Sequence, residues 1–167
     1  MSVIAQNLFA QPGRWFRGNL HMHTTQSDGA RSPAEAVAWY RAQGYDFVSA
    51  TDHITLTETS HLQTADFLTL PGVEYHGDDL DLGHYHVVAI GMAAEPPPFT
   101  PAAPLQRVID AFRARGAFVS IAHPYWCGQS ARDLLAVNNY HAIEVFNATC
   151  RALNDKGLSS AHWDDLL

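Results

Sequence analysis

Four short apolar segments of this chain each end in a side chain that can bind a metal ion or carry a proton. The segments are 15–23, 45–53, 67–74 and 117–123, and they end in His23, His53, Glu74 and His123. Short apolar runs between turn residues are typical of buried strands. In barrels of parallel strands the loops after the strands build the site, so reactive side chains gather at the carboxyl ends. The pattern favours an α/β fold with a mostly parallel sheet, either open or closed into a barrel.

Helices are expected between these segments. Ser32 and Glu35 form a capping box, which predicts a helix that begins there and stops at Gly44. The spacing of apolar residues predicts a second helix over 105–115, and residues 160–167 also have a helical pattern. Strand, helix and strand therefore alternate, as an α/β fold requires.

Two more strands are expected, at 84–91 and 141–147. His86 lies at the start of its strand, so it joins the other ligands only if that strand bends or runs in the opposite direction. Glu144 lies near the end of its strand, where it is either a partner of a ligand histidine or a buried, hydrogen-bonded glutamate. The proline-rich segment 95–101 predicts an extended connector.

Composition favours a single domain over residues 1–167, because a chain of 167 residues with 47% hydrophobic content can bury one core. Ten histidines equal the ten lysines and arginines, and the net charge is −7. This balance points to metal binding or proton chemistry, and it argues against nucleic acid as a partner. The first residues lack a signal-peptide pattern and no stretch approaches the ~20 apolar residues of a membrane span, so we expect a cytoplasmic protein without a membrane partner.

Nitrogen and oxygen ligands recur along the chain. Alternate residues of a strand point to one side, so His21 and His23 can converge on one ion. The whole ligand set is His21, His23, Asp28, His53, Glu74, His86 and His123. Such ligands suit Zn²⁺, Mn²⁺ or Fe²⁺. The set exceeds what one tetrahedral ion needs, so we expect two or three divalent ions, with Glu74 as the bridge.

In this order and spacing the motifs resemble the PHP (polymerase and histidinol phosphatase) domain family of metal-dependent phosphoesterases. They are HMH at 21–23, SDG at 27–29, TDH at 51–53, GVE at 72–74, HVVAIG from 86 and HP at 123–124. The resemblance extends from Gly18 to Leu167, and segment 40–53 is most similar to the carbaryl-hydrolase-like branch. It implies a distorted seven-stranded β/α barrel with a trinuclear site at the strand carboxyl ends.

The resemblance also implies how the ligands are shared. One ion is held by His21, His23 and Glu74, a second by Glu74, His86 and His123, and a third by Asp28 and His53. The family ordinarily adds a late Asp-x-His pair, and this chain contains no Asp-x-His. We therefore expect a (β/α)7 barrel of the PHP type that is truncated before this motif and incomplete at the C-terminus. An incomplete barrel exposes a strand edge, which favours a homo-oligomer.

The expected activity is hydrolysis of a small phosphoester by a metal-activated water. The alternatives are hydrolysis of a carbamate or carboxylic ester, a metal-binding but inactive protein, and a proofreading or regulatory module of a polymerase. Asp52 is expected to orient a ligand histidine, and His84 to approach the substrate or protonate a leaving group. Four arginines are possible phosphate ligands: Arg14, Arg17, Arg31 and Arg151.

Overall fold

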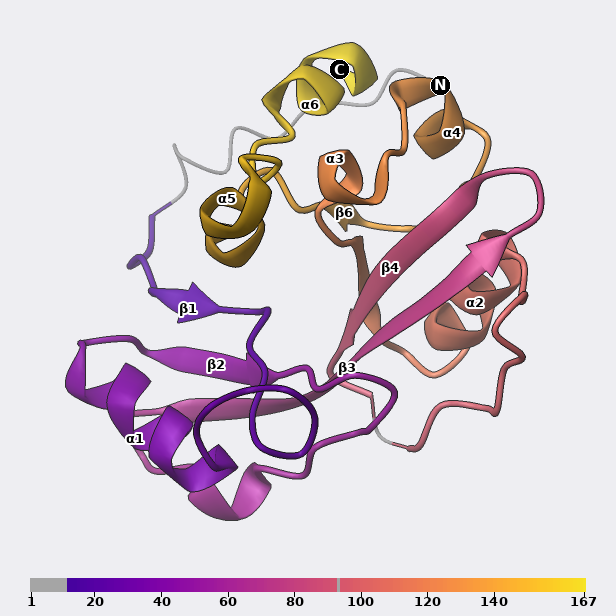
Figure 1. Cartoon of the computed structure of the whole chain (residues 1–167). Helices are drawn as coiled ribbons and strands as arrows, with labels where there is room; N and C mark the ends of the chain where they lie inside the picture. The colour runs from indigo at the N-terminus through magenta and orange to yellow at the C-terminus, as the bar shows by residue number, and fades with distance from the viewer. Residues whose placement is uncertain (1–11, 93) are drawn as a thin grey trace.

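The computed structural model describes residues 12–92 and 94–167, and it shows a curled mixed sheet with helices around it (Figure 1). Six strands lie side by side in chain order. Their bounds are β1 Gly18–Asn19, β2 Phe47–Ala50, β3 Leu68–Asp79, β4 Gly83–Ile90, β5 Phe118–Ile121 and β6 Ala142–Ile143. The helices are α1 Pro33–Ala42, α2 Leu105–Arg113, α3 Pro124–Cys127, α4 Ala131–Leu135, α5 Ala148–Asn154 and α6 Ser160–Leu166, with a 3-10 turn, η2, at Ser60–Leu62.

The strands do not all run in one direction. β1, β2 and β3 are parallel to one another, and β5 is parallel to β6. β4 is antiparallel to both of its neighbours, β3 and β5. The start of β4 therefore lies beside the end of β3. The sequence places His86 near the other ligands only if its strand bends or runs in the opposite direction. β4 does run in the opposite direction, so His86 pairs with His76 of β3 and lies at the same end of the sheet as Glu74.

The expected α/β fold of the PHP type is confirmed as a partial barrel. The sheet curls through six strands, and within the described residues β1 and β6 each pair with one neighbour only. These two strands are the open edges of the sheet. Figure 1 shows β1 on the side of α5 and β6 beneath α3.

Most strands differ in length from the expected segments, and β2 covers only Phe47–Ala50 of 45–53 and β6 only Ala142–Ile143 of 141–147. The expected strand 15–23 is reduced to Gly18–Asn19, because beyond it the Thr51 hydroxyl accepts the hydrogen bond of Met22 N–H in place of a backbone carbonyl. β3 continues past Glu74 to Asp79, because its pairing with β4 extends to the tight turn between them.

The ends of the two longest helices are fixed in different ways. α1 begins with the expected capping box, in which the Ser32 hydroxyl accepts from Glu35 N–H and the Glu35 carboxylate accepts from Ser32 N–H. α2 follows Pro104, which has no side chain to cap it. The carboxylate of Asp79 takes that role from the β3–β4 turn, because its Oδ2 accepts from Leu105 N–H at 2.7 Å.

The apolar core lies on the α2 side of the β3–β4 hairpin. This cluster includes Leu105, Val108, Ile109 and Phe112 of α2 with Val73, Tyr75, Tyr85, Val87 and Val119 of the strands. A second cluster packs α1 on β2, through Ala36, Val37, Met22, Val48 and Phe67. The main core packs on the face of the hairpin opposite to Glu74. The Glu74 face carries ionisable side chains toward the hairpin turn, and a small apolar cluster of Val88, Ile90 and Ala122 at its other end.

Three short helices, α3, α4 and α5, were not expected from the sequence. Each has too few turns to display an apolar period. Across residues 12–92 and 94–167, no helix has both the length and the apolar character that crossing a membrane demands.

Candidate metal centre

The carboxylate of Glu74 lies at the centre of a ring of histidines. Its side chain is 1% exposed, and a nitrogen from each of five histidines lies within 3.3 Å of it. Around Oε1 are His86 Nδ1 at 2.8 Å, His123 Nε2 at 3.1 Å and His21 Nε2 at 3.3 Å; around Oε2 are His23 Nε2 at 2.8 Å and His53 Nδ1 at 3.3 Å. The structure thus brings six of the seven expected ligands to one place.

The orientation of these atoms fits metal ligands better than hydrogen-bond partners. His23 Nε2 and Glu74 Oε2 lie 2.8 Å apart, yet within the described residues neither buried atom has a hydrogen-bond partner. Buried polar atoms without a partner are rare, because leaving one unsatisfied costs about 1–3 kcal/mol. Two ligands at about 2.1 Å from a shared Zn²⁺ lie roughly 3.4 Å apart, which is close to the separations around Glu74. The residues present therefore fit divalent cations.

Three sets of side chains can each offer three ligand atoms within 4.8 Å of one another. The sets are His21, Glu74 and His123; His23, His53 and Glu74; and His53, His76 and His86. Glu74 belongs to two of the sets, which agrees with a bridging carboxylate. The sets divide the histidines differently from the partition that the family resemblance implies.

His21 and His23 lie side by side because the segment that carries them is tied to the end of β2. Thr51 N–H donates to Met22 O at 2.8 Å, and Met22 N–H donates to the Thr51 hydroxyl at 3.0 Å. Met22 points into the core and is 7% exposed, while both histidines point to the other side. The expected alternation of this segment is confirmed.

Two residues at strand ends adopt left-handed backbone conformations. Ile54, which follows His53, has φ 60°, and its N–H donates to Glu74 O at 2.9 Å. His123 has φ 26° immediately before Pro124. Such angles are uncommon for side chains other than glycine and cost on the order of 1–3 kcal/mol, and they concentrate at functional sites. Both residues are next to or within the ring of histidines, because His53 Nδ1 and His123 Nε2 lie 3.3 Å and 3.1 Å from the Glu74 carboxylate.

Glu144, just after β6, accepts hydrogen bonds from two of the residues around Glu74, His21 and His123. His21 Nδ1–H donates to Oε1 at 3.1 Å, and His123 N–H donates to Oε2 at 3.0 Å. Burial opposes a charge on His21, but the hydrogen bonds with Glu144 and Glu74 outweigh it and raise the pKa of His21 to about 10. Burial also opposes the charge on Glu144, yet the hydrogen bond with His21 lowers the pKa of Glu144. A carboxylate on Nδ1 fixes the orientation of the ring, so that His21 Nε2 faces Glu74 Oε1 at 3.3 Å.

His53 and His86 favour the neutral form, in which an imidazole binds metal. Burial lowers the pKa of His53 despite the charge of Glu74. Burial also lowers the pKa of His86 to about 4, although the hydrogen bond with Glu74 acts in the opposite direction. Neutral imidazole nitrogen carries the lone pair that a cation needs.

Asp28 lies at the rim of the centre, with a side chain that is 67% exposed. Its Oδ1 is 2.7 Å from His23 Nδ1, and its Oδ2 is 3.8 Å from His53 Nε2. Its slight burial opposes the charge, but the hydrogen bond with His23 lowers the pKa of Asp28. In this arrangement Asp28 orients His23 and remains near His53, where the resemblance places it as a ligand.

Asp52 is fully buried, and its contacts differ from the expected one. Within the described residues its carboxylate accepts only from Thr24, Ser27 and Thr57, at 2.5–2.8 Å. Burial opposes its charge, but these hydrogen bonds lower the pKa of Asp52. Asp52 therefore holds the loop that carries Asp28 rather than a histidine ring, and its catalytic role stays a prediction.

His84 lies next to the centre through His86. Its Nε2 is 3.0 Å from His86 Nε2, and its Nδ1 is 2.9 Å from Asp78 Oδ1. Trp126 covers this side, with its ring centroid 5.4 Å from that of His86 and 5.2 Å from that of His123. The expected proximity of His84 to the site is present, and its role in proton transfer stays a prediction.

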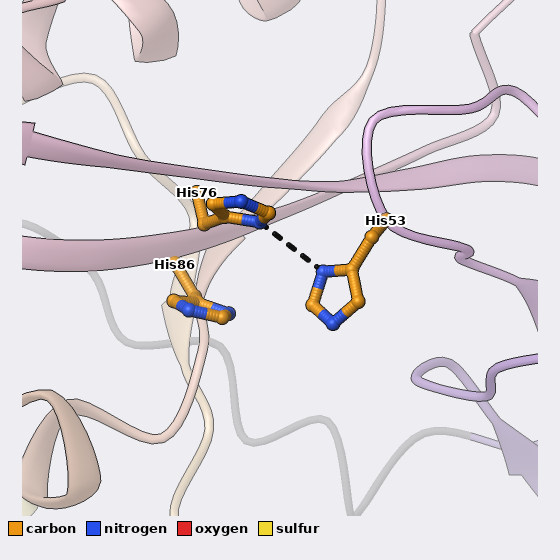
Figure 2. Close-up of side chains that lie close together, drawn as sticks. All are labelled: His53, His76 and His86. Atoms are coloured by element: carbon orange, nitrogen blue, oxygen red, sulfur yellow. Dashed lines mark hydrogen bonds between the residues drawn. The ribbon is translucent and has the colours of Figure 1, made fainter. Parts of the chain in front are cut away.

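His76 was missed in the sequence. It lies two residues after Glu74 on β3, with its Nδ1 3.3 Å from His53 Nδ1. Figure 2 shows the rings of His53, His76 and His86 gathered at the hairpin. The alternation of Glu74, His76 and Asp78 was a signal for this position, but it was hidden because the strand was expected to end at Glu74.

A cavity of about 650 Å³ opens over the histidines. Trp39, Tyr40, Trp126 and Leu153 form part of its wall, together with Arg31. Of the four arginines considered for phosphate binding, Arg31 is the one that lines this cavity. The other three have partners elsewhere: Arg14 pairs with Asp46, Arg17 donates to Gln43 O, and Arg151 pairs with Asp155.

No family model matches the sequence, and no curated protein matches it. Solved structures do share its fold. A two-domain protein from Bacteroides vulgatus that contains a predicted PHP-like metal-dependent phosphoesterase superposes with a TM-score of 0.61 at 22% identity, over 79% of this chain and 44% of that chain. This chain thus spans less than half the length of that protein.

Two further structures match over most of both chains. An amidohydrolase from Chromobacterium violaceum, solved with bound sulfate and no metal, has a TM-score of 0.64 at 16% identity, over 77% of this chain and 76% of that chain. A proposed metal-dependent phosphoesterase from Bifidobacterium adolescentis has a TM-score of 0.64 at 16% identity, over 87% of this chain and 84% of that chain. These similarities show the PHP-type fold, and the carbaryl-hydrolase-like branch stays a prediction.

Proposed function

We propose that this protein is a metal-dependent hydrolase of small phosphoesters. The observation that carries the proposal is the buried Glu74 carboxylate with histidine nitrogens on both of its oxygens. A carboxylate in such surroundings is a bridging ligand for divalent cations. The fold shared with predicted metal-dependent phosphoesterases supports the reaction class.

The residues that would hold the cations are the three sets around Glu74 and the β3–β4 hairpin. When bound, Zn²⁺, Mn²⁺ or Fe²⁺ polarises phosphoryl oxygens and lowers the pKa of water toward neutrality. Two or three ions fit the number of ligand sets.

The chain's own side chains would bind and orient the substrate. Arg31 at the cavity wall would pair with a phosphoryl oxygen, because a guanidinium offers two parallel donors. Trp39 and Trp126, which line the cavity, would shield the reacting group from bulk water. His84, whose Nδ1 lies 2.9 Å from Asp78 Oδ1, would pass a proton to a leaving group from the hairpin side.

The test compares metal-free protein with protein reloaded with Mn²⁺, Fe²⁺ or Zn²⁺. The substrates are bis-(p-nitrophenyl) phosphate, p-nitrophenyl phosphate, p-nitrophenyl acetate and an aryl carbamate. We expect metal-dependent turnover of a phosphate ester and its loss in Glu74→Gln. Turnover confined to the acetate or the carbamate would replace the proposal with the carboxylic ester or carbamate hydrolase.

Metal binding without turnover of any substrate would instead favour a metal-binding protein that is catalytically impaired. The sequence lacks the Asp-x-His that the family ordinarily supplies, which makes this outcome the main competitor. The cytoplasmic location expected from the sequence stays a prediction.

A further inference from the structure

One face of the β3–β4 hairpin carries ionisable side chains from both strands. In the register, His76 pairs with His86 and Asp78 pairs with His84. Glu74 lies on the same face, because alternate residues of a strand point to one side. The ligand-bearing surface therefore continues past Glu74 toward the hairpin turn.

The opposite face of the hairpin is fixed to the core. The Tyr85 hydroxyl donates to Ala103 O at 2.7 Å, and the Tyr75 hydroxyl donates to Thr100 O at 3.2 Å. Gly77 allows this packing, since a Cβ there would lie 2.6 Å from the Tyr85 hydroxyl and 2.9 Å from Pro101 O. The backbone at His76 is thus fixed by the packing of the neighbouring residues Tyr75 and Gly77. The position of the His76 ring is therefore set by a strand and not by a loop.

His53 reaches the hairpin from the loop after β2. Its Nδ1 is 3.3 Å from His76 Nδ1, and the ring centroids of His76 and His86 are 5.2 Å apart, nearly parallel at 28°. Figure 2 shows the three rings turned toward a common space beside the hairpin. Each ring offers one nitrogen, and these atoms lie within 4.8 Å of one another.

We propose that His76, with His53 and His86, forms a three-histidine cation site next to the Glu74 centre. The site differs from the arrangement that the family resemblance implies, in which His53 shares its ion with Asp28. Here His53 Nε2 is 3.8 Å from Asp28 Oδ2, whereas its Nδ1 faces the hairpin. Three imidazole nitrogens suit Zn²⁺ or Co²⁺ and leave a fourth position open for water or substrate.

His53 connects the new site to Glu74. Its Nδ1 lies 3.3 Å from Glu74 Oε2 and 3.3 Å from His76 Nδ1. One nitrogen binds one ion, so an ion held with His76 and His86 removes His53 from the set with His23 and Glu74. His76 thereby determines which of the two ions His53 binds. The ion held by His53, His76 and His86 would be the cation of the centre nearest to the hairpin turn.

The inference rests on the proposed metal-dependent function, and metal content separates the two. Metal-free wild-type protein, His76→Asn and the control His61→Asn are dialysed against Zn²⁺, and bound metal is measured by mass spectrometry. His61 is exposed in η2 and outside the three sets. We expect His76→Asn to hold about one ion fewer per chain, and His61→Asn to match wild type.

Equal metal content and affinity in His76→Asn and wild type would overturn the three-histidine site while leaving the proposed function intact. A wild-type protein that binds no divalent cation would overturn both. Thermal unfolding in chelator shows whether the variant folds. If His76→Asn is destabilised in chelator, the metal content of His76→Asp, which restores a ligand, is measured instead. Recovery of the ion in His76→Asp supports the site, and failure to recover it contradicts the site.

Discussion

His21 Nδ1 lies 3.1 Å from Oε1 of Glu144, a residue 123 positions later in the chain. The same carboxylate accepts His123 N–H at 3.0 Å, and Asn147 Nδ2 donates to both of its oxygens at 3.2 Å. Glu144 is therefore a positioning residue for His21 and His123, two expected ligands that lie far apart in the chain.

Glu144→Gln should weaken metal binding by about 10- to 100-fold, as is typical when the partner of a ligand histidine is removed. The amide keeps the shape but loses the charge that orients the ring of His21. Calorimetric titration with Zn²⁺ measures the effect, with the exposed Glu58→Gln as control. Unchanged affinity in Glu144→Gln would show that Glu144 has only a structural role.

Glu74→Gln should remove most of the stabilisation of the fold by divalent cations, because two of the three ligand sets contain Glu74. A ligand at 100 times its Kd stabilises the folded state by about 2.7 kcal/mol, which appears as a rise in Tm. We expect that rise in wild type and a much smaller one in the variant, measured by calorimetry with and without Mn²⁺. A variant that retains the full rise would contradict the central place of Glu74.

Arg31→Met should raise KM for a phosphoester by roughly 10-fold with a smaller change in kcat, because a contact made equally in ground and transition states affects binding alone. Steady-state kinetics with the reloaded protein measures this. Arg107→Met, on the exposed side of α2, is the matched control. A loss of kcat with unchanged KM would place Arg31 in the chemical step instead.

Asp79→Asn should lower stability at neutral pH by about 0.3–1 kcal/mol, because the amide oxygen still accepts a hydrogen bond but the negative charge at the helix N-terminus is lost. Partial burial opposes its charge, but hydrogen bonds from the N–H groups of Asp81, Leu105 and Leu82 outweigh it and lower the pKa of Asp79. A lowered pKa means that the stabilisation is present above the unfolded value, about 3.9, and is lost as the pH falls through the folded value.

Urea unfolding of metal-free wild type and Asp79→Asn at pH 7 and pH 3 tests this dependence. The difference in the free energy of unfolding should shrink at pH 3. The exposed neighbour Asp81→Asn should show little difference at either pH. A difference that grows with acidification would refute the assigned sign.

Self-association is expected because β1 and β6 leave open sheet edges in the described part of the chain. Exposed apolar side chains lie beyond β6, among them Phe146 at 56% and Leu158 at 49%. Analytical ultracentrifugation should show a dimer or larger species at micromolar concentration. A sharp monomer over the whole concentration range would contradict this expectation.

The sequence was sufficient to predict which side chains gather around Glu74 from the strand ends. Alternation predicted that His21 and His23 share a side, and the rule for strand carboxyl ends predicted the approach of His53, Glu74 and His123. Each of these expectations depends only on local pattern.

The rest depended on pairing between segments. His76 was missed because the length of β3 is set by its partner β4 and not by its own composition. β1 is short because the side chain of Thr51 replaces a ladder hydrogen bond, which no periodicity reveals. The Asp79 carboxylate caps α2 by accepting from Leu105 N–H, 26 residues later in the chain, and a local pattern does not predict such a contact.

The reversal of β4 also bears on how the centre assembles during folding. Glu74 and His86 are 12 positions apart on one hairpin, a short loop that closes within microseconds. His21 and Glu144 meet only when chain segments 123 positions apart come together, and such distant contacts form slowly. The hairpin half of the centre is therefore expected to exist before the rest, and full cation affinity would appear only in the last folding step.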